Sequence, residues 1–504
     1  MKAMEERSWL RTAASETQFD VAIIGGGING ACLYHQLAHA GFRTLLVDQG
    51  DFASGTSQAS AMMIWGGLLY LQNLRLPTVF KFCLSRERMI REMKGWVQPR
   101  EFRYVPNRGK TGRGALVRAA LELYWLLGLC RRARPKTEIE FSEQAFLAGA
   151  DSKKSLVYEE AVVSPSDASF VCRWILPHRN EDQVPLNYCR LEGGARDPAR
   201  GEWRLDLTDV LGRKEFTARA KLAVNAAGVW TDKVNERFRI RSPFRHILSK
   251  GVFIGLERPA ELRTSLIFDI RSGTDCMALI PWGPAALWGP TETLVEDLEE
   301  GFKVCPSDVR YLLEELNRHL ARKVGAGEIV SLRAGVRPLA VPRDYRLKGG
   351  TLALSRRTEI HEDAAVPWLS IYGGKITGCI EVAESVKRCI EARLGPSGKI
   401  PSDATSESGA QTWESFPGLP DKVPTAAGCV EREMCYTLED YLRRRTNISQ
   451  WVPRGGLGRE NQNLPHLERL AALFPGRDAS SPSSAITAYR QHIEREFDAV
   501  LASC

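Results

Sequence analysis

The glycine-rich stretch near the start of the chain constrains its fold more than any other feature. An apolar run leads directly into Gly25, Gly27 and Gly30, which have the spacing Gly-x-Gly-x-x-Gly. A helix-like segment follows, and a second apolar run ends at Asp48. In such a strand–turn–helix–strand unit, the first glycine permits a tight turn, the second lets the backbone approach a pyrophosphate, and the third lets the helix pack on the strand. The pattern predicts a dinucleotide site.

The helix N-terminus and the acid at the end of the second strand can each bind a polar group of the nucleotide. The helix N-terminus offers free N–H groups and a partial positive charge to phosphates, so we count Ile28 and Asn29 among the binding residues. Asp48 can accept a hydrogen bond from a ribose hydroxyl. A lone motif of this kind is often an ordinary glycine-rich turn, but both flanking strands and the acid at the expected distance favour nucleotide binding.

Length and charge limit the remaining choices. A chain of 504 residues is too long for one small core, so we expect two domains. The net charge of +8 is mild; it permits an anionic substrate or an acidic membrane surface. Nucleic-acid binding is not expected, because no dense Lys/Arg tract with interleaved aromatic residues occurs. No apolar run is long enough to span a bilayer, and the residues before Phe19 do not resemble a signal peptide.

Cysteine and histidine patterns indicate no metal. The twelve cysteines are scattered singly, which is typical of reduced thiols in a cytosolic protein. No group of His, Cys and Asp has metal-site spacing. His35 and His39, in the first helix, are expected to be surface or packing residues.

A small, hydroxyl-rich loop follows the nucleotide unit. Ser54, Thr56 and Ser57 lie in it, and Gly66 and Gly67 come soon after, within apolar residues. Small side chains admit a ligand and hydroxyls donate to it, so the loop suits contact with phosphates or a flavin. A plain Ser/Gly linker is the alternative interpretation.

These runs together resemble the FAD-dependent glycerol-3-phosphate dehydrogenases, which are two-domain flavoproteins of the D-amino-acid-oxidase-like superfamily. The resemblance begins with residues 25–31 and 51–57 and with the Gly66-Gly67-Leu68 run. It continues through residues 225–230, 289–293, 335–339, 373–377 and 437–446.

The resemblance implies an α/β fold. We expect a Rossmann-type FAD-binding domain, similar to that of glutathione reductase, an interleaved β-rich substrate domain and a small C-terminal helical domain. The expected division is a polar extension at 1–18, an FAD-dependent oxidoreductase region at 19–400, a linker at 401–424 and a helical domain at 425–504. Within the oxidoreductase region, the FAD-binding segments are expected at about 19–75, 155–235 and 345–400, with substrate-domain segments between them.

The resemblance also implies non-covalent FAD, since the flavin motifs offer no obvious His or Cys for attachment. The expected cofactor-binding residues are Gly25, Gly27, Ile28, Asn29, Gly30, Asp48, Ser54, Thr56, Ser57, Gly66, Gly67, Ala227, Gly228, Gly374, Lys375, Ile376 and Thr377. Arg337 and Lys375 match the family's catalytic cations, and Tyr70 is expected at the substrate. Arg356 matches a second substrate-side arginine, although Arg357 fits the same position.

Several positions depart from the family pattern. The stretch around Gly66 has Trp65 where the family has histidine and Leu69 where it has a substrate-holding arginine. Phe253 replaces the histidine that is the family's candidate general base, and Trp125 replaces an aspartate. His246 could act as a displaced base. We therefore expect an intact flavin cradle and a substrate pocket partly rebuilt with apolar residues.

The resulting functional expectation is an FAD-dependent dehydrogenase that converts glycerol 3-phosphate to dihydroxyacetone phosphate and passes electrons to a quinone-type acceptor. An enzyme for another hydroxy or amine substrate, or a non-catalytic flavoprotein, are the alternatives. The substrate is expected to be a small anion. Residues 121–129, followed by basic residues, also suit a helix at an anionic membrane surface, which would place a cytoplasmic protein on the inner face of the membrane. A core helix with a solvated basic end fits the same residues.

Overall fold

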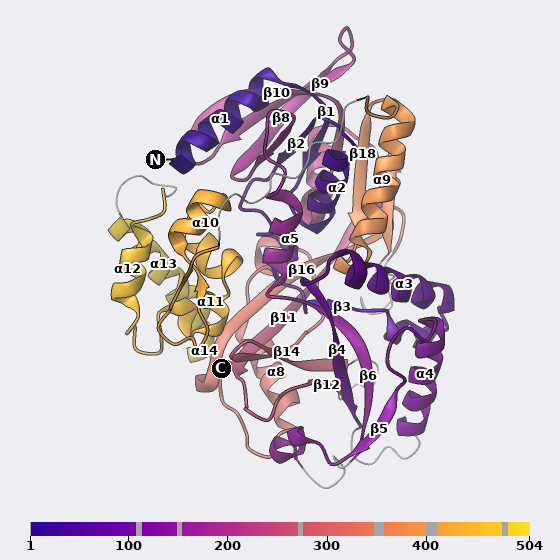
Figure 1. The fold of residues 1–504 in the computed structure, drawn as a ribbon, viewed down its shortest axis with the longest axis vertical. Helices are drawn as coiled ribbons and strands as arrows, with labels where there is room; N and C mark the ends of the chain where they lie inside the picture. Colours follow the sequence, from indigo (N-terminus) through magenta and orange to yellow (C-terminus); the bar gives the residue numbers. More distant parts are fainter. Residues whose placement is uncertain are drawn as a thin grey trace.

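Two large sheets and a group of C-terminal helices make up the molecule (Figure 1). The computed structural model describes residues 2–106, 113–148, 154–270, 276–346, 357–398, 411–475 and 482–504. Both termini lie on the side of the molecule that carries the C-terminal helices (Figure 1). The α/β class expected from the sequence is confirmed.

The first sheet has a parallel centre, because its strands are short apolar runs buried on both faces. Along its main path the strands are β17 (Thr358–Glu362), β18 (Trp368–Gly373), β10 (Lys214–Asn225), β1 (Gln18–Ile24), β2 (Thr44–Val47) and β7 (Gln183–Leu186). The hairpin of β8 (Cys189–Asp197) and β9 (Glu202–Asp209) extends β10 in antiparallel fashion.

The carboxyl ends of the central strands coincide. Ile24, the last residue of β1, is paired with Asn225 of β10 on one side and with Val47 of β2 on the other. Asn225 is in turn paired with Ser370 of β18. Because the strands are parallel, the turns that follow them meet at one edge, which is where open α/β sheets bind ligands.

The second sheet has ten strands and is mostly antiparallel. Its strands are β3 (Met63–Ile64), β4 (Val97–Val105), β5 (Lys136–Ile139), β6 (Lys154–Val163), β11 (Phe244–Glu257), β12 (Ser265–Asp269), β13 (Cys276–Trp282), β14 (Ala285–Gly289), β15 (Thr293–Val295) and β16 (Ile329–Pro342). The long strands β11 and β16 pair along nearly their whole length, so Ser249 lies opposite Arg337. Strands β3 and β6 belong to this sheet, although the sequence suggested cofactor-domain segments there.

Helices cover the faces and edges of both sheets (Figure 1). They are α1 (Lys2–Glu16), α2 (Ile28–His39), α3 (Leu76–Glu92), α4 (Arg113–Leu127), α5 (Asp167–Ile175), α6 (Thr231–Arg237), α7 (Leu298–Gly301), α8 (Pro306–Asn317), α9 (Cys379–Leu394), α10 (Ala426–Arg432), α11 (Ile448–Trp451), α12 (Leu464–Ala471), α13 (Pro482–Ile493) and α14 (Ala499–Ala502). Helix α2 packs between α9 and α5.

The N-terminal residues, which the sequence suggested to be a polar extension, have a defined structure in the described range. They form α1, which packs along β7 and β10. Arg7 is only 1% exposed, and its Nη2 lies 2.7 Å from Oδ1 of Asp209. Composition alone misled here, because a charged residue can be buried when a partner from a distant strand neutralises it.

The expected linker before the C-terminal helices also has structure in its described part, 411–424. β19 (Trp413–Glu414) pairs with β20 (Val423–Pro424), and the side chain of Phe416 between them is buried. Its residues 401–410 lie outside the described residues.

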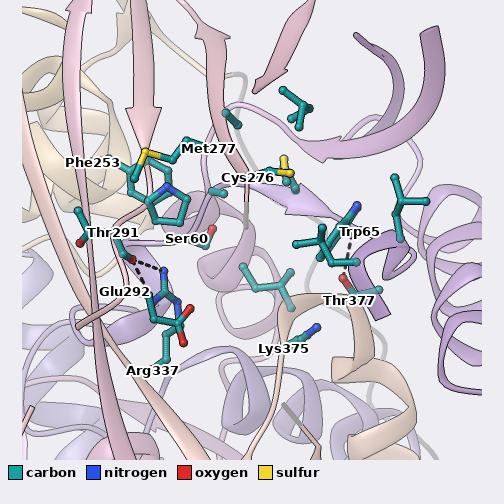
Figure 2. A pocket seen from close by; sticks show the side chains of 18 of the residues that line it. Ser60, Trp65, Phe253, Cys276, Met277, Thr291, Glu292, Arg337, Lys375 and Thr377 are labelled. Atoms are coloured by element: carbon teal, nitrogen blue, oxygen red, sulfur yellow. Dashed lines mark hydrogen bonds between the residues drawn. The ribbon is translucent and has the colours of Figure 1, made fainter. Parts of the chain in front are cut away.

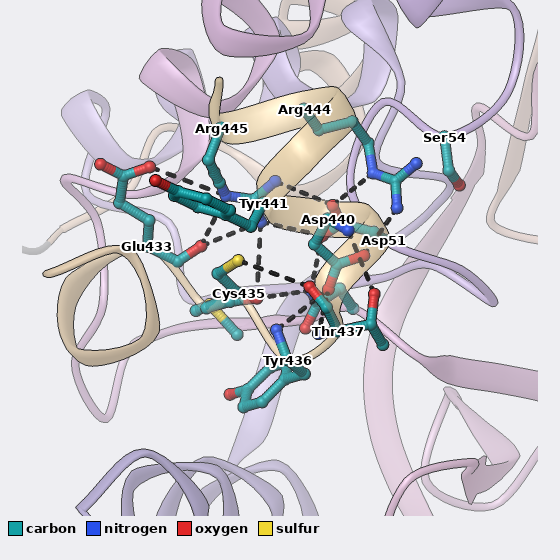
Figure 3. A network of polar contacts seen from close by, with 12 residues as sticks. Asp51, Ser54, Glu433, Cys435, Tyr436, Thr437, Asp440, Tyr441, Arg444 and Arg445 are labelled. Atoms are coloured by element: carbon teal, nitrogen blue, oxygen red, sulfur yellow. Dashed lines mark hydrogen bonds and ion pairs between the residues drawn. The ribbon is translucent and has the colours of Figure 1, made fainter. Parts of the chain in front are cut away.

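The C-terminal part is joined to the first sheet through a buried polar network (Figure 3). Asp51, at the start of the hydroxyl-rich loop, accepts hydrogen bonds from Arg444 and Arg445. Asp440 accepts a hydrogen bond from Arg444 at 2.6 Å and another from Tyr188 at 2.6 Å. The network therefore joins residues that lie nearly four hundred positions apart in the sequence.

Helix α4 is shorter at its C-terminal end than the apolar run suggested. Leu129 and Cys130 have left-handed backbone φ angles of 56° and 58°, so the helix stops at Leu127. Leu121 and Tyr124 are buried, whereas Leu123 and Leu126 are exposed. No helix of the described residues is long and apolar enough to cross a membrane.

Candidate active site

A cavity of about 540 Å³ lies at the carboxyl edge of the first sheet. The residues that line it include five that the sequence singled out: Gly25, Gly27, Asp48, Ala227 and Gly228. Three residues of the hydroxyl-rich loop, Ser54, Thr56 and Ser57, which the sequence also singled out, form another part of the wall. We call these residues, together with the turn at 373–377, the cofactor cradle.

The glycines of the first turn are required by close backbone contacts. Gly25 has a φ of +110°, and a Cβ there would lie 2.5 Å from the carbonyl oxygen of Ala226. A Cβ on Gly30 would lie 1.9 Å from the carbonyl oxygen of Gly25. Gly30 therefore serves the packing of α2 on the turn, as expected, and does not itself line the cavity.

Asp48 is held at the end of β2 by backbone hydrogen bonds. Its Oδ2 accepts from the Gly26 N–H at 2.7 Å, and its Oδ1 accepts from the Gly50 N–H at 2.9 Å. Burial raises the pKa of Asp48 to about 6, although these hydrogen bonds act in the opposite direction. A carboxylate has about four acceptor sites, so Asp48 retains capacity for a ribose hydroxyl.

The hydroxyl-rich loop bridges the two sheets. Ser57 Oγ accepts a hydrogen bond from the Ile28 N–H at 3.0 Å, at the N-terminus of α2. Thr56 Oγ1 donates to the carbonyl oxygen of Val336, on β16, at 2.5 Å. Thr56 and Ser57 line both the first cavity and a second, larger one, so the two cavities are neighbours.

The turn after β18 closes the cradle from the other side. Gly374 has a φ of +112°, and a Cβ there would lie 2.7 Å from Nδ2 of Asn29. Asn29 Nδ2 donates to the carbonyl oxygen of Gly373 at 3.2 Å, which couples this turn to α2. Lys375, Ile376 and Thr377 then line the larger cavity.

The larger cavity has a volume of about 900 Å³ and lies between the cradle and the second sheet. Its walls are largely apolar and include Trp65, Leu69 and Phe253. These are the positions at which the sequence departs from the family pattern. The two neighbouring cavities have volumes of about 540 Å³ and about 900 Å³, and the larger one is mostly apolar, as ligand sites commonly are.

Arg337 projects from β16 into the larger cavity (Figure 2). Its guanidinium lies 3.4 Å from the carbonyl oxygen of Thr291 and 3.5 Å from Oγ of Ser249. The carboxylate of Glu292 lies beside it (Figure 2). A Cβ at Gly251 would lie 2.1 Å from Arg337 Nη2, so the glycine on β11 makes room for the guanidinium.

Lys375 lines the larger cavity, whereas Tyr70, which was expected at the substrate, contacts the Lys375 ammonium and does not line either cavity. Lys375 Nζ lies 2.6 Å from the Tyr70 hydroxyl and 4.5 Å from the centre of its ring. The same ammonium lies 4.7 Å from the centre of the Phe82 ring. Two aromatic rings therefore help to hold this cation at the cavity wall.

Other expected site residues have different surroundings. Gly66 and Gly67 line neither of these cavities; a Cβ on Gly66 would lie 2.1 Å from the Tyr124 hydroxyl, so that glycine serves packing. His246 accepts a hydrogen bond from the Gly373 N–H at 2.9 Å and supports that turn from behind. Arg356 lies outside the described residues.

Two further positions complete the comparison with the expected pattern. Arg357, the alternative to Arg356, is exposed and does not line either cavity. Trp125 lies away from both cavities and donates its indole N–H to the carbonyl oxygen of Arg132 at 2.8 Å. Its replacement of the family's aspartate therefore does not alter the wall of the larger cavity.

Sequence reasoning missed two carboxylates in the larger cavity. Glu292 lies just after β14, within the recognised run 289–293, but no role was predicted for it. Asp269 is buried at the far end and accepts a hydrogen bond from the Tyr104 hydroxyl at 2.7 Å. Its place at the end of an apolar strand carried no recognisable signal.

Comparison with known proteins agrees with this geometry. A model of the family described as FAD dependent oxidoreductase matches residues 20–357. The glycerol-3-phosphate dehydrogenase of Pseudomonas aeruginosa is 27% identical over 429 residues, covering 82% of this chain and 80% of that protein. The structure of glycerol-3-phosphate dehydrogenase from Bacillus halodurans complexed with FAD covers 99% of each chain with a TM-score of 0.69 and 20% identity. Glycine oxidase from Geobacillus kaustophilus covers 74% of this chain and 95% of its own with a TM-score of 0.54 and 18% identity.

The family match spans well over half of the chain and includes the first glycine turn, the hydroxyl-rich loop and Arg337. The cradle provides a pyrophosphate turn, a ribose acceptor and a neighbouring ring cavity, which together fit FAD. The chain therefore belongs to the FAD-dependent oxidoreductase family and is an enzyme that uses FAD.

Proposed function

We propose that the protein is an FAD-dependent dehydrogenase for a small anionic hydroxy compound, related to glycerol 3-phosphate but less highly charged or more apolar. The observation that carries the proposal is the position of Arg337, in the wall of a cavity that adjoins the cofactor cradle. The curated relatives that are named glycerol-3-phosphate dehydrogenases support the substrate class.

The roles of the site residues follow from their charges. FAD, when bound, supplies the hydride acceptor for this class of reaction. Arg337 holds an anionic group of the substrate or stabilises negative charge that develops on its oxygen, since a guanidinium donates two parallel hydrogen bonds. Lys375 adds a second cation, positioned by Tyr70. Glu292, beside Arg337, is the carboxylate placed to accept a proton in this part of the cavity (Figure 2).

The apolar positions argue against tight binding of a dianion. Leu69 occupies a position where the resembling family has a substrate-holding arginine, and it lines the larger cavity. A charge-assisted hydrogen bond contributes roughly 1.5–3 kcal/mol, so affinity for glycerol 3-phosphate should be about tenfold to a hundredfold lower than with that arginine present. Phe253 removes a proton acceptor, and general base catalysis contributes roughly 10²–10⁴ in rate.

A membrane-associated electron acceptor of the quinone type is part of this proposal. Helix α4 exposes Leu116, Leu123 and Leu126, and the neighbouring α3 exposes Phe80. We propose that this apolar face, Leu116, Leu123, Leu126 and Phe80, rests on an anionic bilayer surface. The hydrophobic contact of these side chains would contribute more to membrane binding than charge, because several nearby cations are already paired with carboxylates.

Those ion pairs involve three of the four basic residues that follow α4. Arg132 pairs with Glu87, and Arg134 pairs with Glu122. Lys136 Nζ lies 2.6 Å from Oε1 of Glu138. The basic cluster suggested by the sequence therefore contributes less positive charge toward a membrane than its count implied.

Anaerobic reduction of the bound flavin tests the proposal directly. The purified protein should be yellow and should release FAD into the supernatant on acid precipitation, as expected for a non-covalent cofactor. Glycerol 3-phosphate, a hydroxy acid and glycine are then added separately without oxygen. At least one should bleach the flavin, and failure of polyol phosphates, hydroxy acids and amines alike would favour a non-catalytic flavoprotein.

Steady-state kinetics with an artificial acceptor tests the substrate preference. We expect turnover of glycerol 3-phosphate well below the value of about 10 s⁻¹ that is common for enzymes. Turnover near that value would show that another residue compensates for Phe253 and Leu69, and it would contradict the altered-pocket part of the proposal.

A further inference from the structure

Three histidines meet where helix α2 packs beside α5. His35 and His39 lie one turn apart near the C-terminal end of α2, and His178 follows α5, which packs beside α2 (Figure 1). One ligand atom from each ring lies within 4.8 Å of the others. His35 Nδ1 and His178 Nε2 are 2.8 Å apart.

The geometry of the cluster suits neutral imidazole, the form that coordinates metal ions. His35 Nδ1 and His178 Nε2 lie 2.8 Å apart. At this distance one of the two facing nitrogens donates a proton and the other presents a lone pair.

We propose that His35, His39 and His178 form a binding site for a late first-row divalent metal ion such as Zn²⁺. Zinc–nitrogen bonds are about 2.0–2.1 Å long, so tetrahedral ligand nitrogens lie roughly 3.3 Å apart. The ligand atoms of the cluster lie within 4.8 Å of one another, and one pair is 2.8 Å apart, so this spacing brackets the required separation. Water supplies the fourth ligand, and the exposed side of His39 provides the entry path.

Binding requires no net proton release from the two buried rings. His35 and His178 share one ring proton in their 2.8 Å hydrogen bond. When that proton moves to the other nitrogen of its own ring, both facing nitrogens present lone pairs. The ion then replaces a hydrogen bond by two coordination bonds, which is favourable for metals with strong affinity for imidazole.

The surroundings determine which metals fit. Arg173 lowers the pKa of His35 and opposes any cation, and its guanidinium lies 5.8 Å from the centre of the Trp96 ring. The three histidines offer only nitrogen ligands, with Trp174 packed edge-on against His35 at 4.9 Å. Nitrogen ligands select Zn²⁺, Ni²⁺ or Cu²⁺ over Mg²⁺ and Ca²⁺, which prefer oxygen.

A bound metal would link α2 to the segment that follows α5. The N-terminus of α2 lies in the cofactor cradle, and its C-terminal end carries His35 and His39. Coordination by His178 fixes that end to the segment after α5. The site therefore stabilises the helix on which the cradle is built, and it takes no part in the oxidation itself.

Cobalt titration of the tag-free, FAD-loaded protein tests the site, after dialysis against a chelator and then against metal-free buffer. We expect saturation at one equivalent, with visible Co²⁺ bands at wavelengths longer than the flavin absorption and no thiolate charge-transfer bands. Zn²⁺ should displace the Co²⁺. Thiolate bands would place the ion at cysteines and overturn the proposal, as would the absence of saturable binding.

Matched histidine variants locate the ion. His39→Ala removes an exposed ligand and should keep the FAD content of the wild type. It should weaken Co²⁺ binding by more than the roughly tenfold to hundredfold loss that changes around a ligand cause. His492→Ala removes an exposed histidine of α13 and should leave binding unchanged. Equal Co²⁺ affinity in wild type and His39→Ala would overturn the proposal.

Thermal unfolding provides a second measurement of the same site. An ion that binds only the folded protein raises its stability by mass action. Zn²⁺ should raise the unfolding midpoint of the wild type and of His492→Ala, and the rise should disappear in His39→Ala. A rise of the same size in His39→Ala would show that Zn²⁺ acts elsewhere.

Discussion

Arg445 contacts both carboxylate oxygens of Asp51: its Nη1 lies 2.8 Å from Oδ2, and its Nη2 lies 2.9 Å from Oδ1. Arg444 adds a hydrogen bond to Oδ2 at 2.6 Å, and Asn187 donates to Oδ1 at 2.8 Å. All of these side chains are buried. Figure 3 shows Asp51, Arg444 and Arg445 within the network. The ion pair between Asp51 and Arg445 joins the hydroxyl-rich loop of the cofactor cradle to the C-terminal helical part.

Removing the charge of Asp51 should destabilise the protein strongly. Asp51→Asn leaves two buried guanidinium groups without their shared anion, which costs about 3–5 kcal/mol in comparable buried pairs. Urea denaturation, followed by fluorescence, measures the loss. Glu431→Gln is the control, because its pair with Lys2 is exposed to solvent and should contribute little to stability. Equal shifts in both variants would contradict this account.

Lowering the pH should remove the stabilisation that the ionised Asp51 provides to the folded protein. Burial acts to raise the pKa of Asp51, but Arg445 and Arg444 outweigh it and lower that pKa to about 2. For a carboxyl with a depressed folded-state pKa, the stabilisation is present above the unfolded value near 3.8 and is lost as pH falls toward 2. Denaturation curves between pH 5 and about 2 should therefore converge for wild type and Asp51→Asn. A difference that persists near pH 2 would contradict the assignment.

Affinity for FAD should fall as pH falls through about 6, the pKa to which burial raises Asp48. An ionised Asp48 accepts a ribose hydroxyl more strongly than a neutral one, by about 1 kcal/mol or roughly fivefold in affinity. Fluorescence titration of apoprotein with FAD between pH 7.5 and about 5 measures the effect. Asp48→Asn should bind FAD more weakly and lose most of the pH dependence; an unchanged pH profile in that variant would assign the effect to another group.

Arg337→Ala should abolish most activity and leave FAD bound. The guanidinium lies in the wall of the larger cavity and away from the nucleotide cavity, so its loss affects the substrate alone. Loss of one donor to a developing oxyanion typically costs about 10²–10³ in rate. Arg343→Ala, just beyond the same strand and exposed, is the matched control for kcat/KM. Loss of FAD from Arg337→Ala would instead indicate a structural role.

Membrane association should depend on the exposed leucines of α4. Wild-type protein should sediment with anionic vesicles at low salt, and Leu126→Glu should shift it to the supernatant, because the charged side chain resists burial in the acyl region. Leu126 is 56% exposed, and Leu473, 47% exposed in the C-terminal part, supplies the control Leu473→Glu. Wild-type protein that stays in the supernatant would end the membrane proposal.

Local chemistry explains which parts of the site the sequence could predict. Gly25, Gly30 and Asp48 act through contacts within one strand–turn–helix–strand unit, so their spacing alone carries the information. Arg337 and Lys375 required resemblance to a family, because nothing in their own neighbourhoods distinguishes them from other cations. The cradle and the fold class were therefore accessible, together with the apolar character of the rebuilt cavity.

Contacts between distant segments could not be predicted in the same way. Arg445 is separated from Asp51 by 394 positions, and no periodicity relates them. His35 and His39 were recognised as helix residues, but His178 reaches them only through the packing of α5 against α2. The structure of residues 2–16 was not predicted for a related reason. The charge of Arg7 in helix α1 is neutralised by Asp209, about two hundred positions later in the sequence.

The contacts that hold the hydroxyl-rich loop in place should affect the rate at which the holoenzyme exchanges its FAD. The loop is tied to the C-terminal part through Asp51, to β16 through Thr56, and to α2 through Ser57. Ser54, Thr56 and Ser57 line the cavity of the cofactor cradle, so release of FAD should require these contacts to open. Exchange of bound for free FAD should thus be slow, with a rate that follows the local opening equilibrium of the loop more than the affinity of the cradle.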